Sequence, residues 1–261
     1  MMTLHWPFLK IAALGGAIAI ASPVAWAEDP LQERTAEFYP LPRGGALTIE
    51  GADGSIHIYG WNEPRVRIAA LRNAYTDARL HEIRVETNAE PAAITVHASV
   101  PPAHGIFADR SGTVDFTVNV PETARLELKL KNGEIIIEGL RGGSAHAELM
   151  NGKITALNCI AQVRAHTATG ALELFYQWWE NYPATFDFSI GYGTIRTLIP
   201  IGAKFRVDAA MAHGRIGNGF GFKNPSGAGP GQSLEAATSP DAPVALHFRD
   251  GGGNISIDSW R

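Results

Sequence analysis

Apolar and polar residues alternate along residues 126–139, which read LELKLKNGEIIIEG. Alternation with a period of two is typical of a half-buried strand, because successive side chains point to opposite faces of a sheet. Asn132-Gly133 interrupts the alternation and supplies the positive φ angles that a sharp change of direction needs. The stretch therefore predicts a strand, a corner and a second strand, with one apolar face.

This strand–corner–strand unit recurs along the chain. At seven glycines an aliphatic residue follows two positions later, and the positions five and seven before each glycine are apolar. The seven pairs are Gly54 and Ile56, Gly133 and Ile135, Gly152 and Ile154, Gly170 and Leu172, Gly193 and Ile195, Gly214 and Ile216, and Gly253 and Ile255. In the central part of the chain, successive glycines of this set lie 18 to 23 residues apart. A repeat of about 20 residues is typical of solenoids, propellers and other arrays.

Two all-β architectures account for the repeat. In a β-solenoid, equal positions of successive units stack in parallel, which places Asn132 beside Asn151 and Glu134 beside Lys153. In an antiparallel hairpin sandwich, each Asn-Gly closes a hairpin, and Lys131 faces Glu134. The near-constant spacing favours the β-solenoid, in which each repeat contacts its neighbours, and the hairpin sandwich is the alternative.

The first 27 residues have the features of a secretory signal peptide. Lys10 precedes an apolar run over residues 11–21, and Ala25-Trp26-Ala27 is a small-x-small cleavage site. The apolar run has about half of the length that a membrane span needs. We therefore expect an exported protein, periplasmic or secreted, whose mature chain has no transmembrane span.

The mature chain is expected to form one domain. Residues 28–45 predict a loosely held leader, and residues 46–261 a single β-repeat domain. Residues 76–83, TDARLHEI, are the one helix candidate, with Thr76 as its N-terminal cap. The segment 217–243 is rich in Gly, Pro and Ser, which predicts a flexible insertion.

Composition and charge narrow the function classes. The hydrophobic share of 45% is enough for a core, and the formal net charge of −4 provides no attraction to nucleic acid or to an anionic membrane. The one cysteine, Cys159, excludes an internal disulfide in an exported chain. Its apolar neighbours favour a small buried hydrophobe over a reactive thiol.

The serial units resemble a known bacterial family. GSIHIYGW at 54–61, VNVP at 118–121 and the units NGEIIIEG, NGKITA and TGALEL are similar to those of the "putative adhesin" domain family of unknown function. The resemblance covers most of the mature chain, especially residues 47–216. It implies an exported or membrane-anchored, β-solenoid-like protein, and it carries over no catalytic residues.

The search for catalytic and metal-binding motifs gives little. The chain has no His-Glu-x-x-His sequence, serine elbow, phosphate loop or calcium loop. His146 and His166 lie on outward positions of adjacent units near Glu148, which permits a metal patch but fits a solvated charged face better. We therefore expect no catalytic residues, no metal and no cofactor.

The aromatic run FYQWWENY at 175–182 is the candidate binding surface. Aromatic rings stack on sugar faces and anchor protein interfaces, and two adjacent tryptophans in an extended segment cannot share one face. The candidate residues are Phe175, Tyr176, Trp178, Trp179 and Tyr182. The competing interpretation is that this segment folds back and covers an open flank of the repeat domain.

These features predict a non-catalytic, exported cell-envelope protein that acts as an adhesin-like structural or interaction module. Its partner would be an envelope protein or a glycan, and not nucleic acid. The alternative is a polysaccharide-binding module that uses the aromatic run, or a polysaccharide-active β-helix enzyme. For the enzyme, the nearest approach to a site is Asp187 and Asp208, which share an outward column with Arg164.

Overall fold

The computed structural model describes residues 29–102, 109–223 and 231–261. The predicted signal peptide lies outside the described residues. The fold is all-β with one short helix, which confirms the predicted class. In chain order the elements are β1 (Leu31–Pro40), β2 (Ala46–Glu50), β3 (Asp53–Trp61), β4 (Arg65–Ala74), α1 (Asp77–Glu82), β5 (Arg84–Glu90), β6 (Ala93–Ser99), β7 (Thr113–Pro121), β8 (Arg125–Glu138), β9 (Arg141–Leu157), β10 (Ile160–Phe175), β11 (Ala184–Pro200), β12 (Phe205–Met211), β13 (Gly214–Asn218), β14 (Gln232–Ala237), β15 (Val244–Asp250) and β16 (Gly253–Trp260).

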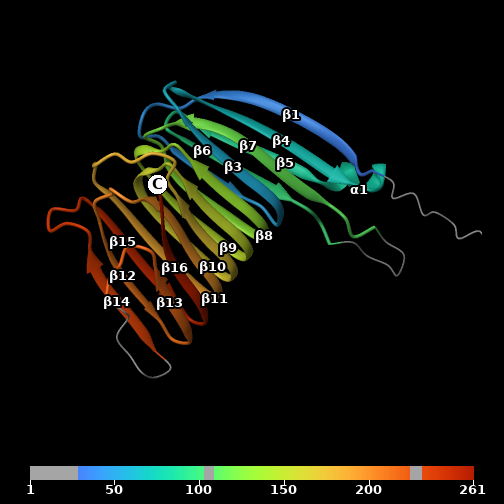
Figure 1. Cartoon of the computed structure of the whole chain (residues 1–261). Helices are drawn as coiled ribbons and strands as arrows, with labels where there is room; N and C mark the ends of the chain where they lie inside the picture. The colour runs from blue at the N-terminus through green and yellow to red at the C-terminus, as the bar shows by residue number, and fades with distance from the viewer. Residues whose placement is uncertain (1–28, 103–108, 224–230) are drawn as a thin grey trace, which may run out of the picture.

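The strands form one mixed sheet of 16 strands. Its longest path of hydrogen-bonded neighbours runs β1-β4-β7-β3-β8-β9-β10-β11-β15-β12-β14. Figure 1 shows β8 to β11 lying side by side in the middle of the molecule, with β1 at one end and β14 at the other. The pairs among β8, β9, β10 and β11 are all parallel, whereas β1 and β14 join the path through antiparallel pairs.

The repeating units pair in register along the central strands. Gly133 lies beside Gly152, Gly152 beside Gly170, and Gly170 beside Gly193. β8 passes through Asn132-Gly133 without reversing and continues to Glu138. A hairpin at Asn132-Gly133, as the antiparallel alternative required, is therefore wrong: this dipeptide bends one long strand between two parallel neighbours.

The corner requires glycine for two reasons. Gly170 has a φ of +137°, which residues with a side chain rarely adopt. A Cβ atom added to Gly170 would lie 1.8 Å from the carbonyl oxygen of Gly152 in the next strand. Gly133, Gly152 and Gly193 have the same kind of close contact. The stacked corners thus explain why glycine recurs at this position.

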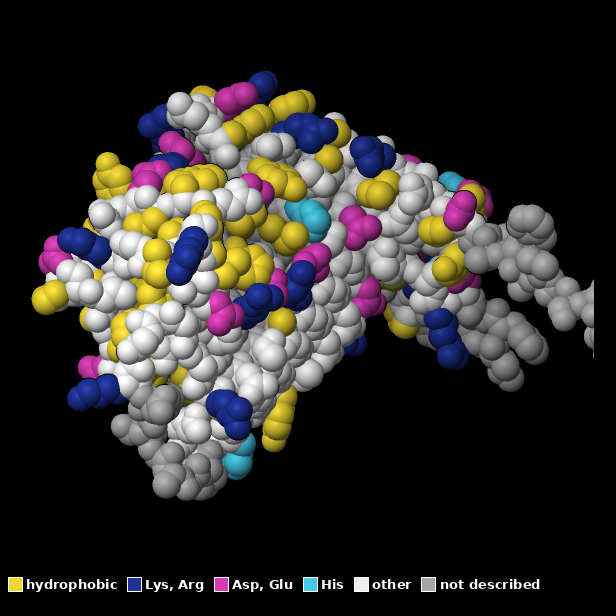
Figure 2. All heavy atoms as spheres, in the orientation of Figure 1, with side chains coloured by type: hydrophobic (Ala, Val, Ile, Leu, Met, Phe, Trp, Pro, Cys, Tyr) yellow, Lys and Arg dark blue, Asp and Glu magenta, His cyan; other side chains and the backbone are white. Residues whose placement is uncertain are grey.

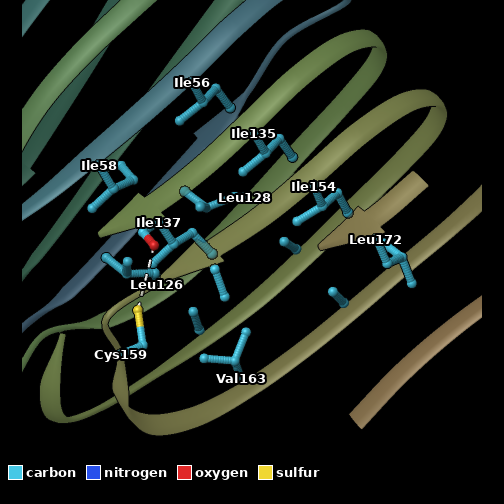
Figure 3. Close-up of a cluster of buried hydrophobic side chains, with 14 of the residues drawn as sticks. Ile56, Ile58, Leu126, Leu128, Ile135, Ile137, Ile154, Cys159, Val163 and Leu172 are labelled. Carbon is cyan, nitrogen blue, oxygen red and sulfur yellow. Dashed lines mark hydrogen bonds between the residues drawn. The ribbon is translucent and has the colours of Figure 1, made fainter. Parts of the chain in front are cut away.

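The aliphatic residues that follow the corners form one continuous core. Figure 3 shows Ile56, Ile135, Ile154 and Leu172 in a row on successive strands, with their side chains on the same side. All four are fully buried, as is Ile195 on the next strand. Burial of each such side chain contributes about 1.5–3 kcal/mol, so this row is a main source of the stability of the stack.

Polar ladders follow the outside of the same strands. The Nδ2 amide of Asn151 donates to Oδ1 of Asn132 at 2.9 Å, and Asn132 donates in turn to Asp53 at 2.5 Å. Lys153 Nζ lies 2.7 Å from Glu134 Oε1. Both predicted neighbour pairs are confirmed. They fix the register more than they add stability, since exposed ion pairs contribute about 0–1 kcal/mol.

The segments predicted as a loose leader and a flexible insertion each contain a strand. The region predicted as a loose leader contains β1, which pairs with β4 along ten residues although almost all of its side chains are exposed. The segment 217–243 contains β14, whose Leu234 is buried. Backbone pairing, to which an exposed side-chain pattern gives no clue, orders β1 and β14.

The predicted helix is confirmed as α1, and the hydroxyl of Thr76 accepts a hydrogen bond from the backbone N–H of Arg79 at 3.3 Å. Within the described part of the chain, no helix is long and apolar enough to span a membrane.

Candidate binding surfaces

The aromatic run at 175–182 divides into an inward and an outward set. Tyr176 is buried and its hydroxyl donates to the carbonyl oxygen of Cys159. Phe175 is half-buried at the end of β10, and Trp179 is half-buried against the core. Trp178 and Tyr182 are 48% and 59% exposed. Of the five candidate residues, only these two are exposed.

The inward residues Tyr176 and Trp179 pack with aromatic side chains of the core. The ring of Trp179 lies 4.8 Å from that of Tyr176 and 6.4 Å from that of Phe205. Phe220 also packs edge-to-face on Phe205, at 4.8 Å between centroids. Edge-to-face aromatic pairs of this kind contribute about 0.5–1.5 kcal/mol beyond the area that they bury. Part of the aromatic run therefore packs against the core and does not face solvent.

The outward set is held in place by an ion pair. The Arg141 guanidinium donates to both carboxylate oxygens of Glu180, at 3.1 and 2.5 Å. Glu180 also accepts a hydrogen bond from the indole N–H of Trp178 at 3.3 Å. The bonds from Arg141 hold the pKa of the Glu180 carboxyl below its ordinary value, so it stays ionised. We call this arrangement the Arg141–Glu180 clasp.

Asn158 fixes the start of the same segment. It is the one described residue other than glycine with a positive φ, at 51°. Its side-chain oxygen accepts from the backbone N–H of Gln177 at 2.8 Å. Asparagine tolerates this conformation because its short polar side chain bonds locally. The segment is thus anchored at both Gln177 and Glu180, and Trp178 lies between these anchors.

Hydrophobic side chains gather around this segment. Figure 2 shows them on the face that carries the C-terminus, with several Lys and Arg side chains among them. Trp260, the last residue of β16, donates from its indole N–H to the carbonyl oxygen of Tyr176 at 2.8 Å. Ile201, which follows β11, is 60% exposed.

A second candidate surface is a shallow open groove of about 690 Å³ on the outer face of five neighbouring strands, β2, β8, β9, β10 and β11. We call it the polar groove. Its lining side chains come from the outward columns eight and six positions before the corner glycines, with buried residues of the sheet as its floor. The polar lining residues are Thr48, Arg125, Glu127, Ser144, His146, Gln162, Arg164, Thr185 and Asp187.

The polar groove contains both paired and unpaired charges. His146 lies between two carboxylates, 3.2 Å from Glu127 and 3.4 Å from Glu148. Arg125, Arg164 and Asp187 have no ion pair within 4.0 Å among the described residues. These three groups are therefore available to a ligand.

The two surfaces adjoin each other. Tyr182 precedes Thr185, a lining residue of the polar groove, by three positions, and three residues span at most about 10 Å. Arg141 of the clasp likewise precedes the lining residue Ser144 by three positions. The backbone of Tyr182 therefore lies within about 10 Å of Thr185, at the β11 end of the polar groove.

The column suggested for a polysaccharide-active enzyme is assembled, but Asp208 does not suit the role of its general acid. Arg164, Asp187, His247 and Asp208 are register neighbours in that order. Asp208 is bound by the Arg249 guanidinium at 2.6 Å, which lowers the pKa of its carboxyl. A general acid in glycoside hydrolysis needs a raised pKa, so Asp208 does not fit that role.

The suggested histidine patch holds no metal-ligand cluster. His146 is engaged by the two glutamates, and His166 contacts the Ser189 hydroxyl at 2.9 Å. No group of three or more His, Cys, Asp or Glu side chains in the described ranges has the geometry to hold a metal ion.

Comparisons with known proteins place the fold. No family model and no curated protein matches the chain. A solved "putative cell adhesion protein" from Clostridium sporogenes superposes on 87% of this chain and on 100% of its own, with a TM-score of 0.50 and 12% identity. This chain has the fold of that protein.

Two further solved structures are more distant. A "putative adhesin" from Bacteroides fragilis aligns with 86% of this chain and 97% of its own at 9% identity and a TM-score of 0.33. One from Parabacteroides merdae aligns with 88% and 97% at 8% identity and a TM-score of 0.23. The resemblance to adhesin-like proteins that the sequence units indicated is confirmed, and at these identities it extends to the fold alone.

The sequence did not predict the polar groove. The column six positions before the corner glycine was recognisable as polar and outward. That this column, together with the one two positions earlier, borders a hollow depends on how the sheet curves across five strands. A one-dimensional pattern carries no signal for that curvature.

Proposed function

We propose that the protein is a non-catalytic, exported module of the cell envelope that binds another molecule through the exposed aromatic residues of the 175–182 run. In this proposal residues 1–27 direct export, and the parallel stack is a β-solenoid that serves as a rigid support. The observation that carries the proposal is the presentation of Trp178 and Tyr182 in solvent on a segment anchored by the Arg141–Glu180 clasp.

Preorganisation is the physical support. A side chain that is ordered before binding loses less entropy when a partner arrives, and aromatic residues dominate the energetic centres of interfaces. Trp178 keeps its indole N–H bonded to Glu180 in the free protein. The fold shared with a protein described as a cell adhesion protein agrees with a binding role.

Cosedimentation with an envelope preparation tests the binding role. The mature protein should sediment with the envelope, and the double variant Trp178→Ala, Tyr182→Ala should bind about tenfold more weakly. Tyr192→Ala is the matched control, because Tyr192 is 68% exposed at a corner of the stack, outside the aromatic run. Equal sedimentation of all three proteins would contradict the proposal.

Fractionation of cells tests export separately. The full chain should be recovered in the periplasm or the medium, shortened by its first 27 residues. A chain that lacks residues 1–27 should stay in the cytoplasm. Retention of the full chain in the cytoplasm at full length would remove the exported part of the proposal.

A further inference from the structure

The polar groove crosses the strands and does not follow any one of them. It is lined by five neighbouring parallel strands, which corresponds to a length of about 19 Å at the usual strand spacing. Each strand contributes one or two hydrogen-bonding side chains at equivalent positions of the repeat. A regular row of this kind fits an extended ligand that lies along the stacking direction and carries hydrogen-bonding groups along its length.

The polar side chains indicate the kind of group that is bound. Arg164 donates through a planar fork, the Asp187 carboxylate accepts through two oxygens, and Gln162 offers both a donor and an acceptor. Pairs of neighbouring hydroxyl groups on a sugar ring match such planar, two-pronged partners, since each hydroxyl both donates and accepts. A purely apolar or purely ionic ligand would leave part of this set unsatisfied.

Charge balance decides between neutral and anionic ligands. Arg125 and Arg164 are offset by Glu127 and Asp187 in the same groove. Glu148 lies next to it, 3.4 Å from His146 and 3.9 Å from the Lys129 ammonium, which offsets its charge. A polyanion would gain from the two guanidinium groups but would be repelled by the carboxylates, and the net charge of the whole chain is −4. The balance therefore favours an uncharged, hydroxyl-rich chain.

An exposed aromatic residue, Tyr182, lies close in sequence to the β11 end of the row. Tyr182 is 59% exposed and three residues from Thr185 of the groove. Aromatic faces stack on the apolar faces of sugar rings. The groove thus has polar side chains along its length and an aromatic surface beside one end.

We infer that the polar groove is a binding site for an extended, neutral glycan chain, which lies across β2 and β8 to β11 and reaches Tyr182 at one end. The inference rests on the proposed function, because it names the class of molecule that the exported module binds. Arg164 on β10 and Asp187 on β11 provide hydrogen bonds near the Tyr182 end, and Ser144 on β9 and Gln162 on β10 provide others along the row.

Affinity electrophoresis and calorimetry with soluble polysaccharides test this assignment. Mannan, dextran and xylan serve as neutral probes, and polygalacturonate serves as the anionic probe. At least one neutral probe should bind, with little dependence on salt, because no net charge is neutralised. Arg164→Gln and Asp187→Asn should each weaken that binding about tenfold, which is the effect of about 1.4 kcal/mol.

Arg215→Gln is the matched control, because Arg215 is an exposed arginine on β13, outside the polar groove. It should bind like the unchanged protein. Binding of polygalacturonate alone, or equal binding by all variants, would overturn the inference. Absence of binding to every polysaccharide, together with envelope binding that still depends on Trp178 and Tyr182, would overturn it and leave the proposed function intact.

Discussion

At the scale of single residues, the corner glycines carry the strictest requirement. Gly152, Gly170 and Gly193 lie on neighbouring strands with their backbones in close contact. At each of them an added Cβ would meet a carbonyl oxygen at 1.8 or 1.9 Å. Neither neighbour can move away, because both belong to hydrogen-bonded strands.

Gly170→Ala should lower the free energy of unfolding by about 3 kcal/mol or more, from backbone strain combined with the clash against Gly152. Gly202→Ala is the control, because a Cβ at Gly202 has no atom within 4 Å, and it should change stability by less than about 0.5 kcal/mol. Chemical denaturation measures both. Similar midpoints for the two variants would show that the stacked corners can relax.

Asp250 is a buried carboxyl with an incomplete set of partners. It is 3% exposed, and its Oδ1 accepts from the backbone N–H of Gly252 at 2.8 Å. Its Oδ2 has no hydrogen-bond partner in the described part of the chain. Burial raises the pKa of Asp250 above its ordinary value of 3.8, so its ionisation opposes folding.

Asp250→Asn should raise the melting temperature at neutral pH, because it keeps an acceptor for Gly252 and removes the buried charge. A folded-state pKa above the unfolded one means that the native protein loses stability as pH rises above about 4. The advantage of the variant should therefore shrink when melting is measured below pH 4. An advantage that does not vary with pH would contradict this origin.

Cys159 should be inert in the folded protein. It is fully buried, and burial raises the pKa of its thiol to about 11, so the reactive thiolate is scarce at about pH 8. Figure 3 shows its sulfur next to the carbonyl oxygen of Ile137, to which it donates at 3.4 Å. A thiol reagent such as DTNB should react only after denaturation with guanidinium chloride. Fast, complete reaction of the native protein would contradict the burial.

At the scale of elements, strands with an alternating apolar pattern were predictable from the sequence, whereas β1 was not. β8 to β11 combine alternation with a corner glycine, and each of these signals limits the backbone directly. β1 carries no alternating apolar pattern, because almost all of its side chains are exposed, and its antiparallel pairing with β4 orders its backbone. The sequence therefore predicted the central strands of the sheet but not β1 at its edge.

The aromatic run shows the same limit within one segment. Residues 176–183 lie outside the strands, so no fixed period assigns their faces. The burial of Tyr176 follows from its hydrogen bond to Cys159, and the exposure of Trp178 from the Arg141–Glu180 clasp. Both interactions depend on residues that are distant in the sequence. The sequence could predict only that adjacent side chains of the run point to opposite sides.

The Arg141–Glu180 clasp can be tested at this scale. Arg141→Ala should leave the fold intact but speed hydrogen exchange across residues 177–183 and weaken envelope binding, because Trp178 loses its fixed partner. Arg215→Gln provides the comparison, as an exposed arginine on another strand. Unchanged exchange in Arg141→Ala would mean that Asn158 alone holds the segment.

At the scale of the whole molecule, the central units of β8 to β11 pair in chain order, whereas the closing unit of β15 and β16 lies between β11 and the strands β12 and β13. Leu126, Ala145 and Val163 occupy one column, and Ile135, Ile154 and Leu172 another. If a unit were removed from the middle, the units on either side of it would meet through surfaces equivalent to those that pair in the full chain. Stability in such arrays is approximately a sum over units and the contacts between adjacent ones.

Deletion of residues 134–152 removes one complete unit and should give a folded, less stable protein, since Gly133 is then followed by Lys153 as it is now by Glu134. Deletion of residues 134–151 is one residue shorter. It shifts the alternation by one position and turns the apolar face outward. That protein should aggregate or remain unfolded. Circular dichroism and size-exclusion chromatography distinguish the two, and equal behaviour would contradict a register-dependent stack.

The parallel, in-register stack also sets how such a protein can change over evolutionary time. Duplication or loss of one unit lengthens or shortens the outer face by one strand spacing, about 4.8 Å, while the chemistry of each row stays the same. The length of ligand that the outer face can contact thus changes in whole steps of one strand spacing. This length is set by the number of units that the gene encodes.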